Sequence, residues 1–311
     1  MTTQDRYRHF AEVEAAGRSA LYVEWASAIA DDLRACTLID GFPAEKRQAN
    51  LWFAAIRVVH GDVLWSARLL DDPEVQRIVR TRRTQTNEPA RCATLLPLLC
   101  SLPQPLALLE IGASAGLCLL PDRYGYRYPD RTLRGGPPEF PCAVTGPAPL
   151  PDALPSVVWR RGLDLNPLSP TTDADWLRAL VWPGQYERLA RLEQALAIAV
   201  ADPPEIVRGD LRTDLPALAA TAPPDATLVV FHTAVLAYLA RDERPAVADT
   251  IRATGARWIA NEGPPVLRGW LPDAPDDGTE DFVLRLDGEP VARTDGHGAY
   301  LHWLSDLVGD G

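Results

Sequence analysis

The sequence predicts an α/β fold in which an all-helical N-terminal domain precedes a mostly parallel sheet that closes with an antiparallel hairpin. Three observations support this prediction. Apolar residues recur at helical spacing between Tyr7 and Leu102, for example at Trp25, Ile29 and Leu33. Beyond this region, short apolar runs alternate with helical segments, which is typical of a parallel sheet. Several of these runs end in polar residues, which indicates a site at one edge of the sheet.

The expected strands are short apolar runs that are bounded by turn residues. We expect them at residues 106–110, 156–161, 204–211, 226–232, 256–263, 282–286, 290–293 and 297–303. An Asp287-Gly288 pair separates two of these runs, and this dipeptide favours a tight hairpin turn. The hairpin would supply the antiparallel end of the sheet.

Proline-rich residues 101–105 suggest the domain boundary. We therefore expect a helical domain over residues 1–104 and a sheet domain over residues 105–311. The second strand candidate follows the first only after a long stretch rich in proline and glycine, so we predict an insertion at about residues 122–155.

Composition limits the classes of function. Hydrophobic residues make up 47% of the 311 residues and charged residues 23%, which is enough for a substantial core. The net charge of −11 disfavours nucleic acid as a partner. No apolar run approaches 18 residues and the first residues lack a signal core, so we expect a cytoplasmic protein without a membrane segment. Five widely spaced cysteines predict free thiols and no metal site.

A strand followed by a loop of small residues is the central feature of the sequence. The apolar run from Leu106 ends at Glu110, the loop spans Gly112 to Gly116, and a helix is expected from Leu117. This order builds a nucleotide site at the carboxyl end of a parallel strand, where a helix N-terminus offers unpaired N–H groups. Such a loop also occurs where a helix merely packs close to a strand, and the sequence leaves both interpretations open.

Residues 110–116, Glu-Ile-Gly-Ala-Ser-Ala-Gly, resemble the first motif of class I methyltransferases that use S-adenosylmethionine (SAM). Ser114 stands where that family has its middle glycine. The resemblance implies a Rossmann-like methyltransferase sheet over residues 105–311. It also implies that SAM is the cofactor and that the loop residues Glu110, Gly112, Ala113, Ser114 and Gly116 bind it.

Two later strand ends extend the resemblance. Asp164, within Arg161-Gly-Leu-Asp-Leu-Asn-Pro167, resembles the second motif, whose acidic residue accepts hydrogen bonds from both ribose hydroxyls. Asp210 and Leu211 resemble the third motif, in which the acid accepts from the adenine amino group and the apolar residue packs on the ring. A turn or capping role is the alternative for each aspartate.

A polar segment precedes the loop, and its residues Gln85, Asn87, Glu88 and Arg91 are the candidate substrate-binding residues. The position of this segment, just before the nucleotide motif, suggests that it lines the mouth of the site. Helix capping by Asn87, with Glu88 in the first turn, is the alternative.

Two titratable residues end strands at the edge where such sheets place their chemistry. His232 ends the run at residues 226–232, and Glu262 lies at the end of the run at residues 256–263. Either residue could remove a proton from a methyl acceptor. A structural histidine with satisfied ring nitrogens is the alternative.

The favoured hypothesis is therefore a SAM-dependent methyltransferase acting on a small-molecule or peptide acceptor. A non-catalytic SAM- or nucleotide-binding module with the same fold is the alternative. A dinucleotide-dependent oxidoreductase is disfavoured because no G-x-G-x-x-G follows the strand. The whole chain also resembles a bacterial family known as domain of unknown function 2332, a resemblance that implies no activity. The sequence indicates no oligomeric state.

Overall fold

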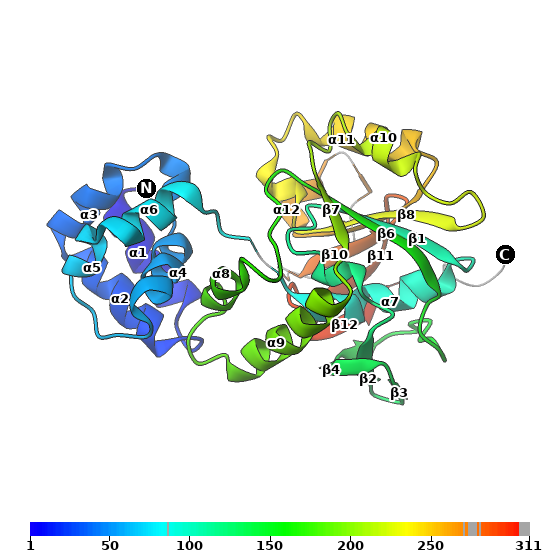
Figure 1. Cartoon of the computed structure of the whole chain (residues 1–311), viewed down its shortest axis with the longest axis horizontal. Coiled ribbons are helices and arrows are strands. Elements are labelled where there is room, and N and C mark those ends of the chain that lie inside the picture. Colours follow the sequence, from blue (N-terminus) through cyan, green and yellow to red (C-terminus); the bar gives the residue numbers. More distant parts are fainter. Residues whose placement is uncertain (86, 270, 273–278, 280, 305–311) are drawn as a thin grey trace. The chain divides into compact units, whose positions relative to one another are not determined.

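The computed structural model describes residues 1–85, 87–269, 271–272, 279 and 281–304 (Figure 1). The chain forms two compact units. The first consists of Met1–Thr86 and Thr171–Glu193, and the second of Asn87–Pro170 and Gln194–Gly311. These units differ from the predicted division at residue 104, because residues 87–104 belong to the unit that contains the sheet.

Helices make up the regular structure of the first unit in its described residues. They are α1 (Thr3–His9), a π-helical turn (Phe10–Glu14), α2 (Ala20–Asp31), α3 (Leu33–Asp40), a 3-10 turn (Ala44–Lys46), α4 (Ala49–His60), α5 (Arg68–Asp71), α6 (Pro73–Thr81) and α8 (Ala174–Ala179). Helix α9 (Tyr186–Ala201) contains the boundary between the units.

Local sequence signals explain where these helices begin, and aromatic packing holds them together. Asp32 caps α3 by accepting hydrogen bonds from two backbone N–H groups, and Asp72 caps α6, which starts with a proline. Trp25, Trp52 and Phe53 are fully buried and fill the space between the helices.

The second unit is organised around a nine-stranded sheet with the order β5-β12-β11-β10-β9-β8-β1-β6-β7. The strands are β1 (Leu106–Ile111), β5 (Ala143–Thr145), β6 (Val157–Asp164), β7 (Glu205–Arg208), β8 (Thr227–Thr233), β9 (Arg257–Glu262), β10 (Phe282–Leu286), β11 (Glu289–Thr294) and β12 (Tyr300–Trp303). Neighbouring strands are parallel from β7 through β9 and antiparallel from β9 through β12. The protein is therefore an α/β protein with a large, mostly parallel mixed sheet.

The central strand β1 is buried at every position, as expected for a parallel strand that is covered on both faces. One face packs Leu109, Val230 and Trp258 against apolar residues of α10 (Leu215–Ala219), α11 (Arg244–Ala253) and α12 (Pro264–Leu267). Because side chains alternate along a strand, the neighbour Glu110 belongs to the opposite face.

The first part of the predicted insertion forms a small separate sheet, with the order β3-β2-β4, whereas its later strand β5 pairs with β12 at the edge of the main sheet. Its strands are β2 (Tyr124–Tyr128), β3 (Arg131–Leu133) and β4 (Gly136–Pro141). Three buried tyrosine hydroxyls tie it to the segments around β1. Tyr124 donates to the carbonyl of Leu117, Tyr126 to that of Pro121 and Tyr128 to that of Ala93.

The prediction of a helix directly after the small-residue loop is wrong. Only a three-residue 3-10 turn, Leu117–Leu119, follows the loop. Pro121 comes two residues later, and proline disfavours helical backbone at the residue before it. The carbonyl oxygens of Leu117 and Pro121 accept tyrosine hydroxyls from β2 and are not helix acceptors. Another 3-10 turn (Pro89–Arg91) and α7 (Cys92–Ser101) precede β1.

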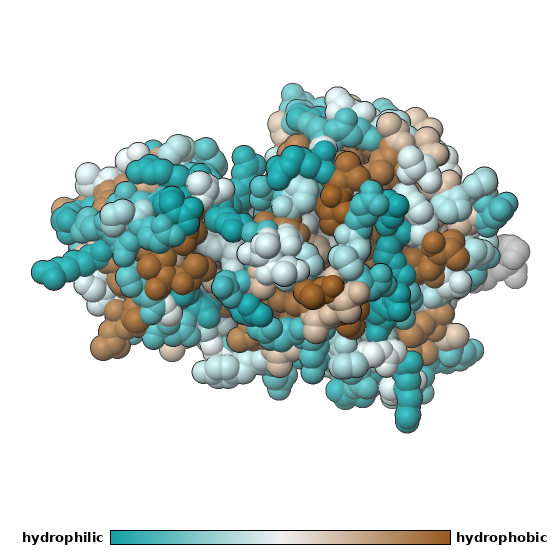
Figure 2. All heavy atoms as spheres, in the orientation of Figure 1, coloured by the Kyte–Doolittle hydropathy of each residue, from teal (hydrophilic) through white to brown (hydrophobic). Residues whose placement is uncertain are grey.

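Hydrophilic residues dominate the face of the molecule in Figure 2, and hydrophobic residues form small patches among them. Single exposed apolar side chains of this kind are ordinary on a protein surface. No helix in the described residues combines the length and the apolar character needed to cross a lipid bilayer.

The loop after β1 needs glycine at position 116. Gly116 has φ +71°, and an added Cβ would lie 2.6 Å from Cγ of Pro204. We expect Gly116→Ala to lower the free energy of unfolding by at least about 2 kcal/mol, because strained backbone and overpacking add. Gly255→Ala is the matched control, since Gly255 has φ +73° with no atom within 4 Å of the added Cβ.

Chemical denaturation of the two variants tests this prediction. The control should lose only about 1–2 kcal/mol from backbone strain. Equal losses of unfolding free energy in Gly116→Ala and Gly255→Ala would contradict the steric clash expected between a Cβ at position 116 and Pro204.

Candidate functional site

The candidate site lies where the parallel strands end, at the carboxyl edge of the sheet. Strands β6, β1, β8 and β9 are consecutive parallel neighbours, so their carboxyl ends lie along one edge. Residues 112–116 follow β1, and the last residues of the other three strands are Asp164, Thr233 and Glu262. Ligands of open α/β sheets bind outside this edge.

All five backbone N–H groups of the loop at residues 112–116 donate hydrogen bonds to acceptors within the protein. Gly112 and Ala113 donate to the carbonyl of Leu163, and Gly116 donates to the carbonyl of Ala113. Ser114, at φ 51°, donates to Oδ2 of Asp164 over 2.7 Å, and Ala115 donates to Oδ1 of Asn87 over 3.0 Å. The loop is therefore fixed by side chains from β6 and from the segment before α7. It keeps no unpaired N–H group for an anion.

Asp164 is the predicted ribose ligand, and its carboxylate keeps acceptor capacity. Oδ2 accepts the N–H of Ser114, and Oδ1 accepts the N–H of Asn166 over 2.6 Å. A carboxylate offers about four acceptor positions, so about two remain. The residue is partly exposed, and a ligand at the edge could reach it.

Glu110 is buried on the same sheet face as Asp164, because Glu110 pairs with Gly162 and side chains two apart in β6 share a face. Its Oε2 atom is fully enclosed and has no hydrogen-bond partner among the described residues. Burial raises the pKa of Glu110 well above its ordinary value. The Cys118 and Asp164 groups raise it further, and Arg91 opposes the shift.

The polar segment before the loop reaches this edge through two of its residues. Asn87 accepts the N–H of Ala115 and donates through Nδ2 to Oγ of Ser114 over 2.9 Å. Arg91 donates through Nη1 to the carbonyl and hydroxyl oxygens of Thr233, both at 3.1 Å, and through Nε to the carbonyl of Gly296.

Glu88 caps the turn at Pro89–Arg91 by accepting the N–H of Ala90, the capping role that the sequence analysis had considered for Asn87. Gln85 belongs to the first unit, and its substrate-binding role stays a prediction.

His232 and Glu262 form a buried pair whose geometry opposes the expected role of a base. Both side chains have no exposed surface, and Nδ1 of His232 lies 2.7 Å from Oε1 of Glu262. Trp258 donates to Nε2 over 3.0 Å, so both ring nitrogens have partners. Glu262 also accepts the N–H groups of Val235 and Leu236. The pair fixes the turn after β8 and leaves no nitrogen to accept a proton from an acceptor molecule.

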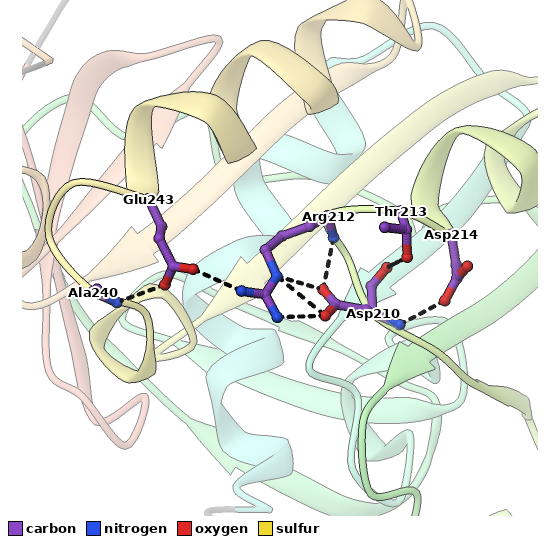
Figure 3. A network of polar contacts seen from close by, with 6 residues as sticks. All are labelled: Asp210, Arg212, Thr213, Asp214, Ala240 and Glu243. Carbon is purple, nitrogen blue, oxygen red and sulfur yellow. Dashed lines mark hydrogen bonds and ion pairs between the residues drawn. The ribbon is translucent and has the colours of Figure 1, made fainter.

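Asp210 is held by its own loop, as Figure 3 shows. Arg212 donates to both carboxylate oxygens through Nε and Nη2, and its backbone N–H donates to Oδ1. These contacts occupy the carboxylate, and the Arg212 guanidinium holds the pKa of Asp210 below its ordinary value. Arg212 then reaches Glu243 at the start of α11, while Leu211 packs on the apolar core. The geometry thus opposes the expected adenine contacts of Asp210 and Leu211.

Thr233 is the residue at this edge that the sequence analysis did not single out. It follows His232 directly, and its side chain turns to the opposite face because β8 alternates. The register Glu110↔Phe231 places Thr233 on the face of Glu110, next to Arg91. Strand alternation from the apolar Val230 could have identified it.

The described residues contain no group of three or more His, Cys, Asp and Glu side chains that could hold a metal ion. All five cysteines are free thiols, and four of them are buried.

The chain belongs to the bacterial domain-of-unknown-function family 2332, whose description is "Uncharacterized protein conserved in bacteria". The family model matches residues 4–63 and 64–303. No curated protein and no solved structure matches the chain. The family thus gives no activity, and the case for a function depends on the site.

The buried carboxyl of Glu110 makes stability depend on pH. Its folded pKa lies above its unfolded value, so the folded state binds more protons and stability falls as pH rises above about 4.5. Glu110→Gln removes this loss. We expect the variant to gain stability relative to the wild type as pH increases toward neutrality, measured by urea denaturation across pH. Glu289→Gln, which changes an exposed side chain, is the control. If the free energy of unfolding of Glu110→Gln changed with pH in parallel with the wild type, the raised pKa of Glu110 would be refuted.

Removing Glu262 tests the structural role of the buried pair. Glu262→Leu leaves His232 and two backbone N–H groups without an acceptor. We expect a loss of about 3–5 kcal/mol in the free energy of unfolding. Thr294→Val is the control. It removes one buried hydrogen bond to Asn261, the neighbour of Glu262 in β9, and should cost only about 1–2 kcal/mol. Similar losses in the two variants would contradict this role.

Proposed function

We propose that this family member is a SAM-dependent methyltransferase that acts on a small-molecule or peptide acceptor. The observation that carries the proposal is the position of Asp164. It ends the strand next to β1, it contacts the small-residue loop directly, and it retains acceptor positions for two neighbouring ribose hydroxyls. A partly exposed carboxylate in this place has the chemistry that an adenosine requires.

The order of the parallel strands supports the proposal. Numbered along the chain, the five parallel neighbours β7-β6-β1-β8-β9 have the order 3-2-1-4-5, which is that of Rossmann-like sheets. The order reverses between β1 and β8, and such sheets bind ligands at this point. Glu110, Thr233 and Arg91 gather there.

The paired loop favours SAM over a dinucleotide. A pyrophosphate needs several unpaired N–H donors, and the loop at residues 112–116 has none. SAM carries no phosphate, so a fully paired loop does not disfavour it. The missing helix after the loop removes the other anion-binding feature of a dinucleotide site.

In this proposal the bound cofactor supplies an electrophilic methyl group, and the protein contributes mainly position. Asp164 would hold the ribose, and the loop would hold the adjoining part of the nucleoside through close backbone approach. His232 and Glu262 would act indirectly, because Glu262 fixes the turn that places Val235 beneath Gly112. An added Cβ on Gly112 would lie 2.6 Å from Cγ2 of Val235, so this contact sets the position of the loop.

A non-catalytic SAM- or nucleotide-binding module is the second candidate. It is favoured by the burial of the His232–Glu262 pair, which leaves no accessible base among the residues expected to supply one. The contacts of Arg212 with the Asp210 carboxylate, the expected adenine ligand, also favour it. Incubation with SAM and a panel of amine, hydroxyl and carboxyl acceptors separates the two candidates. Release of S-adenosylhomocysteine supports the enzyme, and tight binding without release supports the module.

Paired substitutions test which aspartate binds the nucleoside. We expect Asp164→Asn to weaken S-adenosylhomocysteine binding about tenfold or more in calorimetry, because a charged acceptor of two hydroxyls is lost. Asp210→Asn is the matched control. Since Arg212 already occupies that carboxylate, its affinity should stay within about twofold of the wild type. The reverse pattern would assign the nucleoside to Asp210, and no binding to the wild type would overturn the proposal.

A further inference from the structure

Arg91 is a buried arginine whose hydrogen-bond partners in the described residues are all uncharged. Only 6% of the residue is exposed. Its hydrogen bonds go to two backbone carbonyls, of Thr233 and Gly296, and to the Thr233 hydroxyl. These contacts come from the end of β8 and from the turn between β11 and β12, and they hold the guanidinium in one orientation.

One side of this guanidinium remains without a partner in the described chain. Among the described residues, Nη2 of Arg91 makes no hydrogen bond and no carboxylate forms an ion pair with this guanidinium. The half-buried Arg160, by contrast, makes a double contact with the carboxylate of Asp122. Nη2 is also not among the fully enclosed unpaired atoms, so it keeps some accessible surface. A buried cation without an anion is costly, and an anionic ligand would offset that cost.

Glu110 does not neutralise Arg91. The two groups are close enough to interact electrostatically but do not form an ion pair, and Oε2 of Glu110 has no hydrogen-bond partner. Burial raises the pKa of Glu110, which favours the neutral acid, a hydrogen-bond donor. An unpaired nitrogen of Arg91 and an unpaired carboxyl oxygen of Glu110 thus lie close enough to interact at the ends of β1 and β8.

We propose that Arg91 binds the carboxylate of a small-molecule ligand at the carboxyl edge of the sheet, between the ends of β1 and β8. Nη2 would donate to one carboxylate oxygen, in a charge-assisted hydrogen bond. A phosphate fits this place less well, because it needs several donors and every N–H group of the neighbouring loop is already paired.

Two sources of the carboxylate are compatible with the proposed function. One is the amino-acid end of the cofactor, and the other is the methyl acceptor. The carboxylate site itself stands on the geometry of Arg91 and does not require that SAM bind. The experiment therefore uses simple carboxylates as well as adenosine compounds.

The test follows the Nε–Hε resonance of Arg91 by NMR in the full chain, assigned by its loss in Arg91→Lys. Titration with sodium benzoate should shift this resonance and saturate. Benzamide and sodium chloride at the same concentrations should not move it, because they lack the carboxylate. An Arg91 resonance that benzoate leaves in place would overturn the proposal.

Variants separate binding from a purely structural role of Arg91. We expect Arg91→Met to weaken benzoate binding roughly tenfold to a hundredfold, and Arg91→Lys to retain part of it because the charge remains. Arg285→Met is the matched control, since Arg285 is also buried and donates to the carbonyl of Gly288. It should lose stability yet bind benzoate like the wild type. Equal benzoate affinity in Arg91→Met and the wild type would refute the site. Should Arg91→Met not fold, the wild-type titration and Arg91→Lys still decide.

Two adenosine compounds identify the source. A shift of the Arg91 resonance by S-adenosylhomocysteine, but not by methylthioadenosine, which lacks the amino-acid end, assigns the carboxylate to the cofactor. Continued binding of benzoate in the presence of S-adenosylhomocysteine assigns it to the acceptor. If neither adenosine compound binds, the methyltransferase proposal fails, whereas a saturable benzoate shift still supports the carboxylate site.

Discussion

Two side chains, Asp164 and Asn87, accept the backbone N–H groups of Ser114 and Ala115 in the loop after β1, and the rest of the site depends on these hydrogen bonds. A loop of small residues has little side-chain packing to hold it, and here no helix follows to fix its end. Instead, the carboxylate of Asp164 in β6 and the amide of Asn87 before α7 hold the loop in position. With the carbonyls of Leu163 and Ala113, they leave the loop no unpaired N–H group for an anion. In the proposed function, a ligand would therefore meet the acceptor positions of Asp164 and the unpaired groups of Glu110 and Arg91.

Neighbouring side chains of β8 have different roles because they alternate between the two faces of the sheet. His232 turns to the apolar face, where Trp258 and Glu262 satisfy both ring nitrogens. Its neighbour Thr233 turns to the other face and orients Arg91. A shift of one residue in this strand would exchange the two roles. The buried pair therefore stabilises the turn after β8. On the opposite face of the same strand, Thr233 positions the guanidinium of Arg91, which a ligand at this edge would meet.

Sequence patterns predicted the central strands β1 and β8 well because each contains an unbroken apolar run, and the hairpin at Asp287-Gly288 follows from turn chemistry alone. The 3-10 turn after the loop was not predicted, because the tyrosines of the insertion compete for carbonyls that a helix would use. Asp164 and Glu262 do lie at the ends of parallel strands, as the sequence indicated, but the sequence did not predict their hydrogen-bond partners. Neither the capture of Asp210 by Arg212 nor the burial of His232 can be inferred from spacing, because both depend on contacts made in the folded chain.

The central claim is that this edge of the sheet holds an adenosine. A crystal structure of the protein grown with S-adenosylhomocysteine tests it most directly. The account predicts that both ribose hydroxyls lie within hydrogen-bond distance of the Asp164 carboxylate, beside the unchanged loop at residues 112–116. A nucleoside bound elsewhere on the chain, or an edge without ligand at a concentration that saturates binding in solution, would contradict it.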